Sequence, residues 1–185
     1  MKTTEYTIEQ HIENEKGWLF YDAAFKCFKE INKHTQGENI LDIGCSGGVL
    51  ISLLKIFNPN KSFFGLEGND SFQTMWDDRN IQVYVDDVYS TNFSDRQFDT
   101  VITSHVIEHL EDPKRFIKEC SRICKRMIHV VPEDDVFHKN FGSPHLTIFN
   151  RVNFLELFSD SDFELVVYES IQDTHMNSLI YVADV

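Results

Sequence analysis

The sequence lacks the long apolar segments found in membrane and secreted proteins. No apolar run among its 185 residues reaches the roughly 20 residues that span a bilayer. The first ten residues also lack the apolar core of a secretory signal. We therefore expect no membrane partner and a cytoplasmic location.

Basic residues are scarce. The chain has 17 lysines and arginines against 30 aspartates and glutamates, a formal net charge of −13. Because proteins that bind a nucleic acid backbone normally present a basic face, this composition argues against DNA or long RNA as a partner. A local basic cluster is interpreted as the solvated face of a helix, and it consists of Lys114, Arg115, Lys118, Arg122, Lys125 and Arg126.

Cysteine is limited to four residues at irregular spacings, Cys27, Cys45, Cys120 and Cys124. Cys120 and Cys124 are predicted to share one helix face, but no second pair of Cys or His residues completes a zinc pattern. All four are therefore predicted to be free thiols in a reducing compartment.

What the sequence does contain is a regular alternation of apolar runs and amphipathic segments. Alternating strands and helices imply a parallel sheet that is covered on both faces. The predicted strands are residues 39–43, 61–67, 82–85, 98–104 and 127–131, followed by two closing strands at 163–169 and 176–183. The predicted helices are residues 48–57, 70–78, 113–124 and 152–158, with Asp70 as a helix cap and Pro113 in a first turn.

The N-terminal part is predicted to be helical. Apolar residues recur at spacings of three and four across residues 7–33, and Gly17 is placed to divide this segment in two. We expect one domain over residues 1–185, in which residues 1–36 form a helical lid and residues 37–185 form the core. The lid residues expected to contact a ligand are Trp18, Phe20 and Tyr21.

The most informative segment follows the first predicted strand and reads Asp42-Ile43-Gly44-Cys45-Ser46-Gly47-Gly48. Glycines allow positive φ and let a ligand approach the main chain. Glu67 ends the next strand, near the spacing at which a carboxylate meets ribose hydroxyls in nucleotide-binding βαβ units. Because ligands of parallel sheets bind beyond the strand ends, one crevice for a nucleoside-containing cofactor is predicted at Gly44, Glu67, Asp87, Ser104 and His105.

From Asn39 to Leu165 the sequence resembles the class I S-adenosylmethionine (SAM) dependent methyltransferases, in particular the methyltransferase 11/23-like group. The motifs that carry the resemblance are Leu41-Asp42-Ile43-Gly44-Cys45, Gly65-Leu66-Glu67, Asp87, Phe98-Asp99-Thr100-Val101-Ile102 and the run from Ser104 to Pro113. The resemblance implies a Rossmann-like α/β fold, with a seven-stranded, mostly parallel sheet, helices on both faces and a C-terminal antiparallel hairpin. Ser46 stands where the family usually has glycine.

The resemblance also implies SAM as the cofactor and a role for each motif residue. Gly44 and the backbone of residues 45–48 would lie against the methionine moiety and ribose, and Asp42 would face the methionyl amino end or order the loop. Glu67 would accept from both ribose hydroxyls, and Asp87 would accept from the adenine amino group. The implied cofactor-binding set is Asp42, Gly44, Cys45, Ser46, Gly48, Glu67, Asp87 and Ser104.

Three histidines are candidate catalytic bases, His105, His109 and His145. A base is needed only if the methyl acceptor is a hydroxyl or a protonated amine. His105-x-x-Glu108-His109 also resembles the metal site of ubiquinone-pathway O-methyltransferases and small-RNA 2′-O-methyltransferases. We predict a site without metal, with a divalent ion at His105, Glu108, His109 and His145 as the alternative.

The expected function is methyl transfer from SAM to an oxygen or nitrogen of a small-molecule acceptor. The long loop at residues 133–150 is expected to face this acceptor, with packing as the alternative for its aromatic residues. Three other functions remain open. They are a non-catalytic SAM-binding protein, a methyltransferase of RNA ends or protein, and a nicotinamide oxidoreductase, against which the absence of Gly-x-Gly-x-x-Gly speaks.

Overall fold

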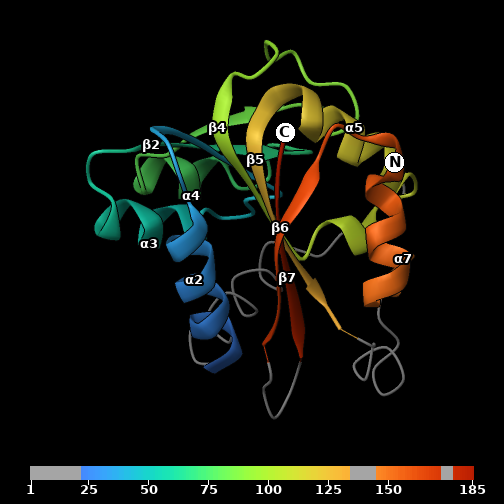
Figure 1. The fold of residues 1–185 in the computed structure, drawn as a ribbon. Helices are drawn as coiled ribbons and strands as arrows, with labels where there is room; N and C mark the ends of the chain where they lie inside the picture. Colours follow the sequence, from blue (N-terminus) through green and yellow to red (C-terminus); the bar gives the residue numbers. More distant parts are fainter. Residues whose placement is uncertain (1–21, 134–144, 172–176) are drawn as a thin grey trace.

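The computed structural model describes residues 22–133, 145–171 and 177–185, which contain one seven-stranded sheet with helices on both faces (Figure 1). The strands are β1 (Asn39–Ile43), β2 (Ser62–Glu67), β3 (Gln82–Val85), β4 (Phe98–Ser104), β5 (Cys124–Pro132), β6 (Glu164–Ile171) and β7 (Ser178–Asp184). Their order is β3-β2-β1-β4-β5-β7-β6, and β7 runs antiparallel to both β5 and β6. The predicted fold, including its C-terminal hairpin, is confirmed.

The described helices are α2 (Asp22–His34), α3 (Val49–Phe57), α4 (Gln73–Asp78), α5 (Pro113–Ile123) and α7 (Arg151–Glu156), with 3₁₀ turns η1 (Ile107–His109) and η2 (Leu157–Asp160). Pro113 opens α5 as predicted, and the Asp112 side chain caps it by accepting from Arg115 N. The predicted cap of α4 is wrong, because the Asp70 carbonyl accepts from Gln73 N in a turn that precedes the helix, and Phe72 is the N-cap residue.

Two apolar layers form the core, one on each face of the sheet. Successive strand residues point to opposite faces, so Leu41 packs in one layer and Ile40 in the other. Figure 1 shows α2 and α3 over one face and α5 and α7 over the other. Because the central strands are covered on both sides, only their ends are available to a ligand.

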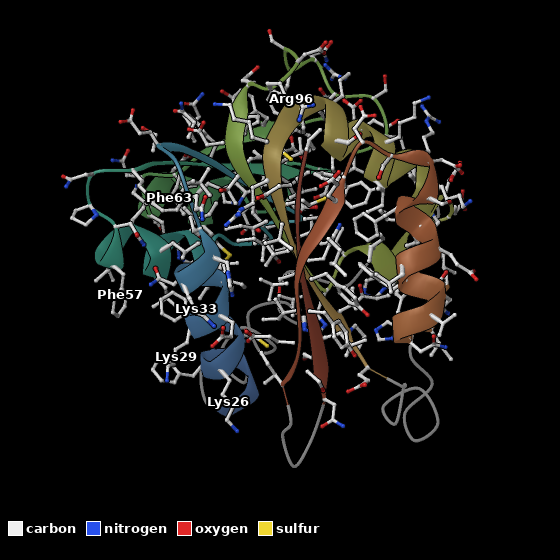
Figure 2. The ribbon with its side chains drawn as sticks, in the orientation of Figure 1. Lys26, Lys29, Lys33, Phe57, Phe63 and Arg96 are labelled. Atoms are coloured by element: carbon white, nitrogen blue, oxygen red, sulfur yellow. The ribbon has the colours of Figure 1, made fainter. Side chains whose placement is uncertain are left out.

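Helix α2 is amphipathic. Phe28 and Ile31 are buried against the sheet, whereas Lys26, Lys29 and Lys33 lie along its outer side (Figure 2). The earlier part of the predicted N-terminal helix, with Gly17 and the proposed lid residues Trp18, Phe20 and Tyr21, lies outside the described residues. Within the described ranges, no helix combines the length and apolar character that a bilayer crossing requires.

All four cysteines are buried, and none of them forms a disulfide within the described residues. Cys124 begins β5 rather than continuing α5, so the prediction that it shares a helix face with Cys120 is wrong. The helix runs directly into the strand without an intervening turn, which moves the start of the strand ahead of the predicted position.

Candidate functional site

The order of the strands in the sheet changes direction between β1 and β4. Strand β1 pairs in parallel with β2 on one side and with β4 on the other, and ligands of α/β sheets bind at the carboxyl ends of the strands at such a point. The loops that leave β1 and β4 touch where Val106 packs on Gly44. Gly44 has φ 73°, and a Cβ at this position would overlap Val106, so the turn requires glycine.

The loop after β1 is tied to the end of β2. Gly44 N donates to Leu66 O at 2.8 Å, and Ser46 N donates to Glu67 Oε2 at 3.0 Å. Gly68 N donates to Glu67 Oε1 at 2.9 Å. Each carboxylate oxygen keeps a lone pair beyond these bonds, so Glu67 is both anchored and able to accept from ribose hydroxyls.

Asp42 lies at the end of β1 and is only 4% exposed. Burial, together with the nearby Glu67 carboxylate, raises the pKa of Asp42 to about 8. Two acids at adjacent strand ends, one of them buried, form an environment that favours a cation. This environment fits the ammonium and sulfonium groups of SAM.

The other predicted cofactor residues differ in their placement. The Cys45 side chain is buried in the core beside Gly65, and burial raises the pKa of its thiol, so only its backbone is available to a ligand. Gly48 has φ 85° and begins α3 as its N-cap. Asp87 is exposed and accepts from Tyr89 N at 3.0 Å.

Asp86, which the sequence analysis did not single out, connects the end of β3 to this region. Its amide donates to Glu67 O at 3.2 Å, and its carboxylate accepts from the Asn92 amide and side chain. Asp87 therefore directly follows a residue whose backbone is hydrogen-bonded to Glu67. The pair of adjacent acids in the sequence was the signal that could have identified Asp86.

Two predicted residues, Ser104 and His105, lie at the carboxyl end of β4. The Ser104 hydroxyl is buried without a hydrogen-bond partner among the described residues. His105 has φ 57°, and its amide donates to Val130 O at 2.9 Å. Its Nδ1 lies 3.3 Å from Glu108 Oε1, an ion-pair distance without hydrogen-bond geometry. Glu108 is fully buried, and neither of its carboxylate oxygens has a hydrogen-bond partner among the described residues.

His109 and His145 come together from separate segments. Their ring centroids are 4.8 Å apart, because the Glu108 carbonyl accepts from both Leu146 N (2.7 Å) and Thr147 N (3.2 Å). One ligand atom from each of Glu108, His109 and His145 lies within 4.8 Å of the others. His105, the fourth residue of the alternative metal set, is not part of this group.

Other contacts in the region were not foreseen or are differently placed. Trp76 and Arg79 donate hydrogen bonds to the carbonyls of Ser46 and Gly47, and no sequence motif marks them. Phe149 is buried against Phe154 in the core, so packing accounts for it. The remaining aromatic residues of that loop, Phe137, His138 and Phe141, lie outside the described residues.

Comparison with known proteins agrees with this arrangement. Residues 41–130 match a family model described as a methyltransferase domain. The ubiquinone biosynthesis O-methyltransferase of Coxiella burnetii is 27% identical over 97 residues, which are 49% of this chain and 40% of that protein. The demethylmenaquinone methyltransferase of Thermotoga maritima is 28% identical over 91 residues, 48% of this chain and 40% of that protein.

The matched region thus spans 40% of the length of these curated relatives. The fold extends further than the sequence similarity. A SAM-dependent methyltransferase from Aquifex aeolicus superimposes with a TM-score of 0.76 at 14% identity, over 98% of this chain and 100% of that one. Residues 41–130 are therefore similar to the methyltransferase domain family, and the chain has the fold of a SAM-dependent methyltransferase.

Proposed function

We propose that this protein binds SAM at the ends of β1 to β4 and transfers its methyl group to an oxygen or nitrogen of a small molecule. SAM is the cofactor of the family, and it supplies a methyl group on a sulfonium that leaves as a neutral thioether. The work left to the protein is mainly to orient donor and acceptor, which contributes on the order of 7–11 kcal/mol in well-aligned systems.

The observation that carries the proposal is the pair of acids at the ends of β1 and β2. Glu67 is held by two backbone amides, and Asp42 is buried beside it with a raised pKa. In the proposed complex Glu67 accepts from the ribose hydroxyls, and Asp42 becomes ionised beside the positive charge of the methionyl end.

The histidines fit an acceptor that must lose a proton, which is a hydroxyl or a protonated amine. The Glu108 carboxylate lies 3.3 Å from His105 Nδ1, where it can orient the imidazole ring. His105 at the end of β4 is then the proposed general base, and Glu108 is its positioning residue. The Coxiella burnetii relative carries an O-methyltransferase name, which supports an oxygen acceptor.

Calorimetric titration with S-adenosylhomocysteine tests the cofactor site. We expect the wild-type protein to bind at micromolar concentrations and Glu67→Ala to weaken binding about tenfold or more, because two charge-assisted bonds are lost. Glu164→Ala is the matched control, since it removes an exposed carboxyl from the edge strand β6.

Absence of binding by the wild type, or binding of NADH in its place, would refute the proposal. Transfer of a labelled methyl group from SAM into fractions of a cell lysate then identifies the acceptor as small molecule, protein or RNA. Binding without transfer to any fraction would favour the non-catalytic alternative.

A second candidate adds a divalent metal ion at Glu108, His109 and His145. Two imidazoles and one carboxylate suit several divalent ions, and the buried carboxylate of Glu108 lacks a hydrogen-bond partner among the described residues. An ion held there would polarise an acceptor hydroxyl. This candidate is the metal site that the sequence analysis gives as an alternative, with Glu108, His109 and His145 but without His105.

Titration of the metal-free protein with Mn²⁺ separates the two candidates. The metal-dependent form predicts one bound ion per chain and an affinity at least about tenfold lower for Glu108→Gln, with the exposed Glu111→Gln as control. Binding that Glu108→Gln leaves unchanged would point to Glu30, His34 and Glu169 instead, where Lys33 already contacts both carboxylates.

A further inference from the structure

Two side chains from the segment after β2 hold the carbonyl groups of the loop after β1. Trp76 in α4 donates from Nε1 to Ser46 O at 2.6 Å, and Arg79, the C-cap residue of α4, donates to Gly47 O. The two residues are three positions apart and therefore project from one side of the helix. Trp76 is 1% exposed, so its indole N–H would have no water partner if the loop moved away.

The loop needs such support because of its backbone conformation. Ser46 has φ 48°, a left-handed conformation that is costly for residues other than glycine. Its amide is held by Glu67 and its carbonyl by Trp76. Hydrogen bonds on both sides of the residue oppose its relaxation into an extended conformation.

We propose that Trp76 and Arg79 are positioning residues that keep residues 46–48 in the cofactor-binding shape before the cofactor arrives. This inference rests on the proposed function of the same loop. Packing acts in the same direction, since a Cβ on Gly48 would lie 2.6 Å from Ile81 Cδ1, just beyond α4. A ligand that meets a preformed loop loses less affinity to ordering of that loop.

Two substitutions remove the hydrogen bonds while keeping most of the packing. Trp76→Phe retains a buried aromatic ring, and Arg79→Met retains the aliphatic stem. For each we expect a Kd for S-adenosylhomocysteine about 5- to 20-fold higher than that of the wild type. In the ligand-free protein we also expect faster hydrogen exchange at the amides of Ser46, Gly47 and Gly48.

A turnover assay with SAM adds a readout that general loss of stability would not produce. Because the loop is expected to contribute equally to substrate and transition-state binding, KM for SAM should rise while kcat stays unchanged. Phe163→Leu is the matched control, since it removes a buried ring from the opposite apolar layer. It should lower stability and leave both Kd and exchange of the loop amides unchanged.

The inference is overturned if Trp76→Phe and Arg79→Met match the wild type in Kd and in loop exchange. If Trp76→Phe does not fold, Arg79→Met decides by the same criteria. Should the wild type fail to bind S-adenosylhomocysteine, the proposed function fails, and hydrogen exchange without ligand still decides whether these side chains hold the loop.

Discussion

At the scale of single residues, Asp42 is expected to link stability to the proposed cofactor binding. Its pKa is raised from 3.8 to about 8 by burial and by Glu67. Between these pH values the folded protein keeps a proton that the unfolded chain has released, so the free energy of unfolding falls as the pH rises from about 4 to 8. A buried acid of this kind is retained at a cost in stability, which is typical of functional sites.

The variant Asp42→Asn should therefore be more stable than the wild type and weaker in binding. Its advantage in unfolding free energy should grow by about 1.4 kcal/mol for each pH unit between pH 5 and 7, because asparagine has no proton to lose. Urea denaturation at several pH values measures this difference. Parallel curves for the two proteins would show that Asp42 is already ionised in the folded state.

The same residue also makes cofactor binding dependent on pH. Ionisation of Asp42 beside the bound cation releases a proton, so affinity for SAM should increase from pH 6 to about 8 and then level off. Calorimetry in two buffers of different ionisation enthalpy counts the released proton. Asp42→Asn should show no release, whereas Glu164→Ala should behave like the wild type.

At the scale of elements, the pairing of β4 with β5 buries a histidine under α5, α7 and η2. His129 Nδ1 shares a hydrogen bond with the Thr103 hydroxyl. Its ring also packs against Phe116, Phe154 and Phe158, with centroids 5.5 to 6.2 Å away. Burial lowers the pKa of His129 to about 3. The imidazole is therefore neutral in the folded protein.

This burial predicts sensitivity to acid. The unfolded chain takes up a proton on His129 near pH 6.5 while the folded protein does not, so its contribution to stability is present above pH 6.5 and is lost as the pH falls towards 3. Between pH 6.5 and 5 the wild type should lose about 2 kcal/mol more than His129→Leu. Thermal or urea denaturation at both pH values measures it, and equal losses would contradict the assignment.

The existence and type of these elements could be predicted from sequence because each strand is a short apolar run bounded by polar or turn residues. The first and last residues of the elements were harder to predict. β5 begins at Cys124 because α5 passes into it directly, and no turn residue marks that junction. α4 begins after a turn whose hydrogen bond uses the Asp70 carbonyl, whereas the sequence suggested its side chain.

The candidate site also contains some residues that the sequence could identify and others that it could not. The glycine turn and Glu67 follow strand ends and were predictable from local pattern. The contacts of Trp76 and Arg79 with the loop depend on how α4 packs, and the position of His145 depends on hydrogen bonds to the Glu108 carbonyl. Such contacts between distant segments leave no periodic signal in the sequence.

At the scale of the whole molecule, acidic residues outnumber basic ones, and several basic side chains form ion pairs with acids. Arg122 contacts Glu119 and Asp95, and Arg126 contacts Asp184 at 2.6 Å. The interpretation of the basic cluster as a solvated helix face is thus wrong for these two residues, and also for Lys125, which lies in β5 and contacts Asp99. Their charges are balanced by acids within the protein.

The hydrogen bonds from Leu146 and Thr147 to the Glu108 carbonyl have a consequence for how this protein can diversify. They fasten residues 146 and 147 to the backbone of η1, beside His109 and His145. Because backbone groups make these bonds, the side chains of residues 146 and 147 can change while His109 and His145 stay adjacent. New side chains at these two positions would alter the surface beside the histidine pair without displacing it.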